Sequence, residues 1–136
     1  MKVSNLMRPR ILIVDDEPTL AAALRRLLVA KYQVFTATRS PDVLEALKSG
    51  ERWDLIISDL MMPELTGMDL YEAVRQLDTD QAERFLFMTG GALTTRAAQF
   101  IAAQRGRTLD KPCDPARLRA SVEAVLEATT SARTDG

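Results

Sequence analysis

Apolar residues follow two alternating patterns along this chain. The first pattern is a short, mostly apolar run, which occurs at residues 11–14, 34–37, 55–57, 85–88 and 108–109. Such runs, rich in β-branched or aromatic residues, are typical of strands buried on both faces of a sheet. The second pattern is the spacing of an amphipathic helix, as in Leu20, Leu24, Leu27 and Leu28 behind Pro18. A helical segment follows each run, so the sequence predicts five strand–helix units.

Capping residues predict where several of these helices begin and end. Ser40 is expected to be the N-cap of the second helix, and Gly50 to end it. Thr66 and Asp69 have the spacing of a capping box, and Asp114 is expected to cap the last helix. The core-facing positions predicted for the last three helices are Leu70, Val74 and Leu77, then Phe100 and Ile101 within residues 95–105, then Leu118, Val122, Val125 and Leu126.

Strands that alternate with helices through short connections predict an α/β fold. Parallel neighbouring strands need right-handed crossovers that pack on the sheet, so helices should cover both faces of a doubly wound parallel sheet. The 136 residues suffice for one ordinary domain. We expect this domain to span residues 10–127, with residues 1–9 and 128–136 as terminal tails or linker stubs.

Composition and charge exclude several classes of function. Eighteen basic and nineteen acidic residues give a net charge of −1, which disfavours nonspecific binding to nucleic acid. The chain has no histidine and one cysteine, Cys113, which excludes histidine-based triads, the usual zinc sites and an intramolecular disulfide. The sequence has no long apolar run and no signal-peptide pattern. We therefore expect no contact with a membrane and a cytoplasmic location.

Polar side chains that could carry chemistry follow four of the five predicted strands. Asp15 and Asp16 end the first strand, Asp59 the third, Thr89 the fourth and Lys111 the fifth. In open α/β sheets, ligands bind outside the carboxyl ends of the strands. Converging carboxylates repel one another unless a cation lies among them, and oxygen ligands without His or Cys favour Mg²⁺. The lysine and the hydroxyl would suit a phosphoryl group.

Four segments, in this order, resemble the receiver domain of two-component response regulators. They read ILIVDDEP at residues 11–18, DLIISDLMMPELTGMD at 54–69, FMTG at 87–90 and KP at 111–112. The resemblance covers about residues 10–127. It implies a flavodoxin-like five-stranded sheet in the order 2-1-3-4-5 and a Lys111–Pro112 bond that is often cis in this family.

The resemblance also implies a role for each residue of the predicted site. Asp59 matches the aspartate that receives a phosphoryl group from a phosphohistidine on a histidine kinase or phosphotransfer protein. Thr89 and Lys111 match the hydroxyl and the lysine that contact this group. The implied Mg²⁺ ligands are Asp15, Asp16, Asp59 and the backbone carbonyl of Met61. A downstream protein partner is expected on the face of the fourth and fifth helices, and the oligomeric state is left open, a dimer being one alternative.

The sequence departs from the family pattern at several positions. Receivers often carry Tyr or Phe three residues before the lysine, where this chain has Thr108. Cys113 stands where Phe usually follows Lys-Pro, and Gly91 lies where a polar side chain could position hydrolytic water. We expect loss of the phosphoryl group to depend little on the side chains at Met61 and Gly91. The run at residues 87–92 and the missing aromatic resemble receivers attached to hybrid histidine kinases.

Two other classes of protein fit parts of the pattern. A phosphatase of the haloacid-dehalogenase kind also uses an aspartate nucleophile, Mg²⁺ and a lysine on an α/β sheet. It needs a second acid two residues after the nucleophile, where Asp59 is followed by Met61. A pseudo-receiver would bind partners without phosphorylation, but its usual sign is a lost acid or lysine. Asp15, Asp59 and Lys111 are all present, so the sequence favours a phosphoacceptor domain, a signalling receiver that catalyses only its own phosphorylation and dephosphorylation.

Overall fold

In the computed structural model, which describes residues 8–91, 94–104 and 106–135, the five predicted runs form one parallel sheet. Its strands are β1 (Arg10–Val14), β2 (Gln33–Ala37), β3 (Leu55–Asp59), β4 (Phe85–Thr89) and β5 (Thr108–Asp110). The strand order is β2-β1-β3-β4-β5, and every neighbouring pair is parallel. The predicted fold class and strand order are therefore confirmed.

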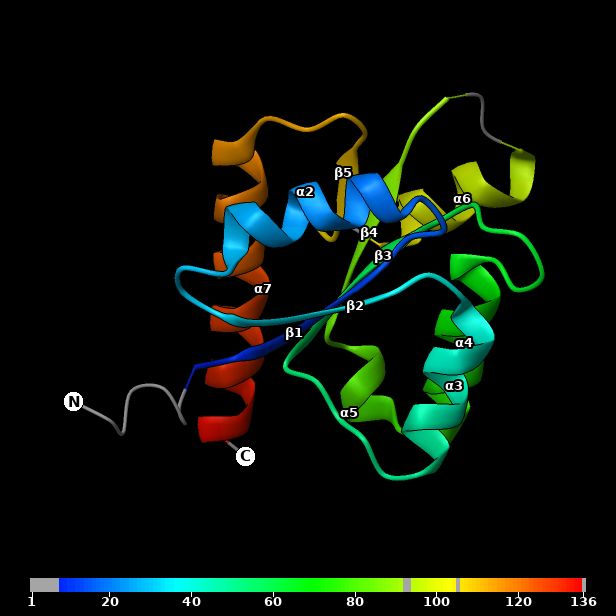
Figure 1. Ribbon diagram of the computed structural model, residues 1–136. Helices are drawn as coiled ribbons and strands as arrows, with labels where there is room; N and C mark the ends of the chain where they lie inside the picture. Colours follow the sequence, from blue (N-terminus) through cyan, green and yellow to red (C-terminus); the bar gives the residue numbers. More distant parts are fainter. Residues whose placement is uncertain (1–7, 92–93, 105, 136) are drawn as a thin grey trace.

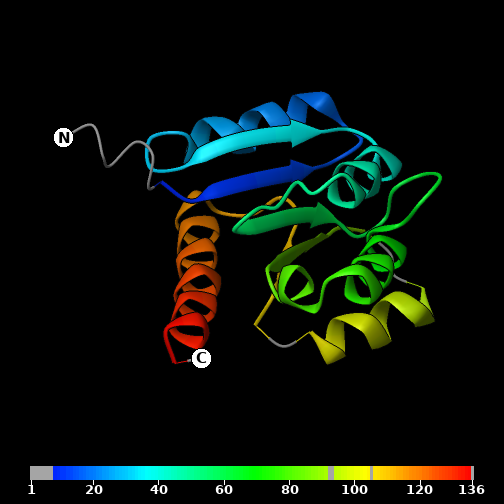
Figure 2. The same cartoon turned by 90° about the horizontal axis from the view of Figure 1, so that it is seen from below.

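Helices cover both faces of this sheet (Figures 1 and 2). They are α2 (Pro18–Leu28), α3 (Ser40–Lys48), α4 (Gly67–Leu77), α5 (Thr79–Ala82), α6 (Thr95–Ala103) and α7 (Pro115–Asp135). Helices α2 and α7 pack on one face, whereas α3, α4, α5 and α6 contribute to the core on the other. None of the helices in the described parts of the chain is long and apolar enough to cross a membrane.

Alternate residues of the three central strands supply the two halves of the core. Ile11 and Ile13 of β1 pack toward α2 and α7, while Leu12 and Val14 pack toward the other helices. Side chains of successive strand residues point to opposite faces, so a strand covered on both sides needs apolar residues at every position. This requirement explains why the three central strands appear in the sequence as apolar runs.

Two of the predicted helix caps are confirmed and one is wrong by a residue. The Thr66 hydroxyl accepts a hydrogen bond from the Asp69 amide at 3.1 Å, and an Asp114 carboxylate oxygen accepts one from the Arg117 amide at 3.2 Å. Ser40, in contrast, is already the first residue of α3, and its hydroxyl is buried and donates to the Met62 sulfur at 3.5 Å. This contact with the core draws the serine away from capping.

Other differences lie at helix ends. Leu77 is 42% exposed because it is the last residue of α4, where the chain turns into α5. The sequence pattern missed α5, which is four residues long and is opened by the Asp78 side chain. Helix α7 continues to Asp135, past the start of the predicted tail at residue 128. Residues 1–7 of the predicted N-terminal tail lie outside the described residues.

Candidate functional site

The carboxyl ends of four strands bring the predicted site residues together. One carboxylate oxygen from each of Asp15, Asp16 and Asp59 lies within 4.8 Å of the others. Asp15 and Asp59 are buried, and Asp16 is exposed. These acids follow β1 and β3, which are neighbours in the sheet, so the parallel register delivers them to the same edge.

Lys111 reaches into this acidic cluster from the end of β5. Its ammonium nitrogen lies 3.2 Å from Asp15 Oδ2 and 3.2 Å from Asp59 Oδ2. The Lys111 amide donates to the Thr89 carbonyl at 2.6 Å, and the Lys111–Pro112 bond is cis, as the resemblance implies. A Cβ on Gly90 would lie 3.2 Å from Lys111 Cβ, so the glycine leaves room for the lysine stem.

Burial and the neighbouring charges shift the pKa values of Asp59 and Lys111. Burial raises the pKa of Asp59, and Asp15 raises it further, whereas the Lys111 ammonium lowers it; the net pKa is above its usual value. Burial lowers the pKa of Lys111, but the charges of Asp59 and Asp15 outweigh this and hold it above the ordinary value. Lys111 therefore stays charged at neutral pH without fully compensating the acids.

The donor set fits a hard divalent cation. All three side chains offer carboxylate oxygens, the ligands that Mg²⁺ prefers. Three carboxylates next to one ammonium leave negative charge that a cation would neutralise. Asp15, Asp16 and Asp59 therefore suit Mg²⁺ by the number and the chemistry of their oxygens.

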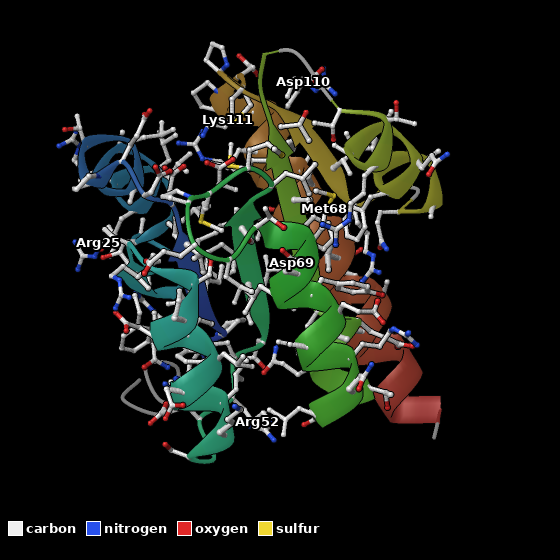
Figure 3. All side chains as sticks on the ribbon, turned by 90° about the vertical axis from the view of Figure 1, so that its right-hand side faces the viewer. Arg25, Arg52, Met68, Asp69, Asp110 and Lys111 are labelled. Carbon is white, nitrogen blue, oxygen red and sulfur yellow. The ribbon has the colours of Figure 1, made fainter. Side chains whose placement is uncertain are left out.

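Thr89 lies at the end of β4, and its hydroxyl faces Asp110, which is not among the site residues that the sequence predicts. Thr89 Oγ1 lies 3.4 Å from Asp110 Oδ1, and the two residues are paired in the β4–β5 register. In Figure 3, Asp110 and Lys111 lie at the same end of the molecule. The available signal was an acid directly before the Lys-Pro pair, but nothing in the sequence pattern places this acid against Thr89.

The loop after Asp59 is tightly held. The Met61 amide donates to Asp59 Oδ1 at 3.4 Å, and the Met61 side chain is 40% exposed. A Cβ on Gly67 would lie 2.3 Å from the Asp59 backbone oxygen, so this position of the predicted motif accepts glycine alone. Arg39 binds Glu64 on the other side of the loop. Its Nε lies 3.1 Å from Glu64 Oε1, and its Nη2 lies 3.0 Å from Glu64 Oε2. Asp59, the last residue of β3, is therefore followed by a loop that hydrogen bonds, close packing at Gly67 and an ion pair hold in place.

Two known proteins are similar in sequence to this chain. The chain is 31% identical over 128 residues to the protein PetR of Rhodobacter capsulatus, which covers 94% of this chain and 53% of PetR. It is 41% identical over 69 residues to the sensor histidine kinase TmoS of Ectopseudomonas mendocina, which covers 51% of this chain and 7% of TmoS. The chain thus spans about half of one relative and a small part of the other.

The fold is similar to that of solved receiver domains. The signal receiver domain of a putative Luxo repressor protein from Vibrio parahaemolyticus superposes with a TM-score of 0.78 at 25% identity, over 94% of this chain and 97% of that one. The family model described as response regulator receiver domain matches residues 11–123, which include every residue of the site. A match over that much of the chain shows that this protein belongs to the family of response regulator receiver domains.

Proposed function

We propose that this chain is a phosphorylation-controlled switch in which Asp59 receives a phosphoryl group from a phosphohistidine on a histidine kinase or phosphotransfer protein. The observation that carries the proposal is the Lys111 ammonium, 3.2 Å from both Asp15 and Asp59 at the carboxyl edge of the sheet. An aspartate at the edge of the sheet, a neighbouring cation and a hydroxyl one strand away supply what phosphoryl transfer needs.

The transfer is an in-line displacement at phosphorus. A bond forms between an Asp59 carboxylate oxygen and phosphorus, and the bond from phosphorus to the donor's histidine nitrogen breaks. The electron pair of the broken bond returns to the imidazole, which leaves as a neutral base when its other nitrogen carries a proton. Lys111 would pair with the negative charge on the phosphoryl oxygens, and the Thr89 hydroxyl would donate a hydrogen bond to one of them.

Asp15, Asp16 and Asp59 would hold Mg²⁺, with the Met61 carbonyl as a further oxygen ligand. When bound, the ion supplies positive charge that reduces repulsion between the carboxylates and the incoming phosphoryl group. Asp15 then has two tasks, since it also holds the Lys111 ammonium in place. The proposed reaction therefore requires Mg²⁺, and EDTA should abolish it.

Phosphorylation would alter the surface around α6 and α7. An acyl phosphate adds roughly −1.5 to −2 charges at pH 7. This charge would draw the Thr89 hydroxyl inward, and Thr89 is the last residue of β4, ahead of α6. A downstream protein that binds near α6 and α7 would sense the change. We also propose a cytoplasmic location, and the similarity to part of a sensor histidine kinase supports a receiver attached to such a kinase.

The test is incorporation of phosphate into the intact chain. Incubation with Mg²⁺ and a small phosphodonor such as acetyl phosphate should add one phosphate by mass to the wild type. Asp59→Asn should remove this addition, and the control Asp42→Asn, which makes the same chemical change at an exposed position of α3, should retain it. A phosphate that persists in Asp59→Asn, or that fails to appear in the wild type with Mg²⁺, contradicts the proposal.

A further inference from the structure

The hydroxyl that the proposed function assigns to the phosphoryl group already has an acceptor. Thr89 Oγ1 lies 3.4 Å from Asp110 Oδ1, and Thr89 is only 7% exposed. A threonine hydroxyl carries a single proton, so it donates to one acceptor at a time. Donation to Asp110 and donation to a phosphoryl oxygen on Asp59 are therefore alternatives.

The sheet brings this acceptor to Thr89. Register pairs Thr89 with Asp110 at the ends of β4 and β5. The next residue, Lys111, sends its ammonium group to Asp15 and Asp59, 3.2 Å from each. In Figure 3, Lys111 lies on the side of α2 and Asp110 on the side of α6. The chain thus places a cation toward the phosphoacceptor and an anion toward the switching hydroxyl.

We propose that Asp110 is a positioning residue that holds the Thr89 hydroxyl in the unphosphorylated state and so opposes the phosphorylated arrangement. The inference rests on the proposed function, because the Thr89 hydroxyl must give up its hydrogen bond to Asp110 before it can donate to a phosphoryl group on Asp59. Thr108, on the same strand, has no aromatic ring with which to restrain the switch. Asp110 supplies a restraint of a different kind, a hydrogen bond to a charged acceptor.

The size of the restraint follows from its geometry. Hydrogen bonds to charged groups are stronger than neutral ones, but Asp110 is exposed and the bond is long. We expect removal of the acceptor to tighten binding of a phosphoryl mimic by about three- to tenfold. Asp110→Ala removes the acceptor, whereas Asp110→Asn keeps a weaker, neutral acceptor of the same shape and should give a smaller change.

The experiment measures the affinity for beryllofluoride in the presence of Mg²⁺ by isothermal titration calorimetry. The wild type is compared with Asp110→Ala, Asp110→Asn and the control Glu127→Gln, which removes one negative charge from an exposed position of α7. Glu127→Gln should bind as the wild type does. In the Asp110 variants without beryllofluoride, the Thr89 methyl resonance should shift toward its position in the beryllofluoride complex.

A second pair of proteins, both carrying Thr89→Val, distinguishes an effect of Asp110 through the Thr89 hydroxyl from direct repulsion between Asp110 and beryllofluoride. Asp110→Ala is repeated in Thr89→Val, which has no hydroxyl to hold. If Asp110 acts through Thr89, the three- to tenfold gain in affinity falls to less than about twofold in this background. An equal gain in both backgrounds would show simple charge repulsion and overturn the inference, as would unchanged affinity in Asp110→Ala.

The outcomes also separate this inference from the proposed function. If the wild type binds beryllofluoride and Asp110→Ala binds it equally, the inference fails while the phosphoacceptor site stands. If the wild type does not bind beryllofluoride with Mg²⁺, both fail together. Thermal unfolding of each variant shows that it is folded before the titration, and the isosteric Asp110→Asn gives a second reading should the alanine variant unfold.

Discussion

Helices α4 and α6 begin in the same way but are held very differently. In each, a threonine N-cap accepts a hydrogen bond from the amide three residues on, Thr66 from Asp69 at 3.1 Å and Thr94 from Ala97 at 3.0 Å. Helix α4 then buries Gly67, Met68, Leu70 and Val74. Among the residues of α6, all of which the structure describes, Ala97 is the one that is fully buried.

Helix α6 contacts the core through Ala97, Phe100 and Ile101. Phe100 is half-buried, and its ring centroid lies 4.9 Å from that of Phe87 on β4 and 5.5 Å from that of Tyr71 on α4. An ion pair from Arg96 to Asp69, at 2.7 Å, adds a link at the surface. A helix with little buried area can shift at low energetic cost. The comparison thus separates α4, which is well buried beside the Asp59 loop, from α6, whose small buried area would allow the response to Thr89 that we propose.

The largest expected effect concerns the first residue of each helix. Gly67→Ala would place a Cβ 2.3 Å from the Asp59 backbone oxygen, so the turn after β3 must move. We expect a loss of about 3 kcal/mol in the free energy of unfolding, measured by urea denaturation. The matched change at the start of α6, Thr95→Ala, affects an exposed residue and should alter stability by less than about 0.5 kcal/mol. Similar losses in both variants would contradict the comparison.

A second pair of variants tests the apolar faces. Leu70→Ala removes a fully buried side chain of α4 and should cost about 3 kcal/mol, whereas Ile101→Ala on α6 removes a half-buried one and should cost about 1 kcal/mol. Both changes delete a branched four-carbon side chain down to a methyl group. Chemical denaturation of the two proteins gives the difference directly. If Ile101→Ala cost as much as Leu70→Ala, α6 would be as firmly attached as α4.

A third test compares acids on the α4 and α6 sides of the site. Because burial and Asp15 raise the pKa of Asp59, ionised Asp59 destabilises the folded state at neutral pH without a divalent cation. Asp59→Asn should therefore raise the melting temperature at pH 7. This gain should shrink as the pH falls through the raised pKa and be lost below about 4, the ordinary value for Asp. Asp110→Asn, at an exposed acid, should change the melting temperature little.

Addition of Mg²⁺ sharpens the same test. A cation that binds the folded state stabilises it, so Mg²⁺ should raise the melting temperature of the wild type more than that of Asp59→Asn. An Asp59→Asn protein that is less stable than the wild type at pH 7 without Mg²⁺ would show that the attraction of Lys111 outweighs burial and repulsion. In that case the pKa of Asp59 would lie below its ordinary value.

The smallest expected effect is loss of the ion pair that joins the two helices. Arg96 and Asp69 are both partly exposed, so Arg96→Ala should lower stability by less than about 0.5 kcal/mol at low salt. Arg96 lowers the pKa of Asp69, and the small contribution should therefore be present above pH 4 and be lost as the carboxylate is protonated. Hydrogen exchange in α6 should speed up while exchange in α4 stays unchanged.

Local signals predicted most of the fold. Apolar runs identified the strands because a strand covered on both faces must be apolar at each position. The Thr66 and Asp114 caps were identified because a cap bonds to an amide within three residues. The Ser40 cap was wrong because its hydroxyl contacts Met62, which is distant in sequence. The buried position expected for Leu77 was wrong because α4 ends at that residue.

The sequence by itself determined which groups reach the carboxyl edge of the sheet, because each lies at the end of its own strand. Only the tertiary structure decided their partners. Lys111 lies 96 residues from Asp15, and Asp110 lies 21 residues from Thr89, so strand order and register alone bring these side chains into contact. The attachment of α6 was decided in the same way, because an N-cap starts a helix and buried area holds it in place.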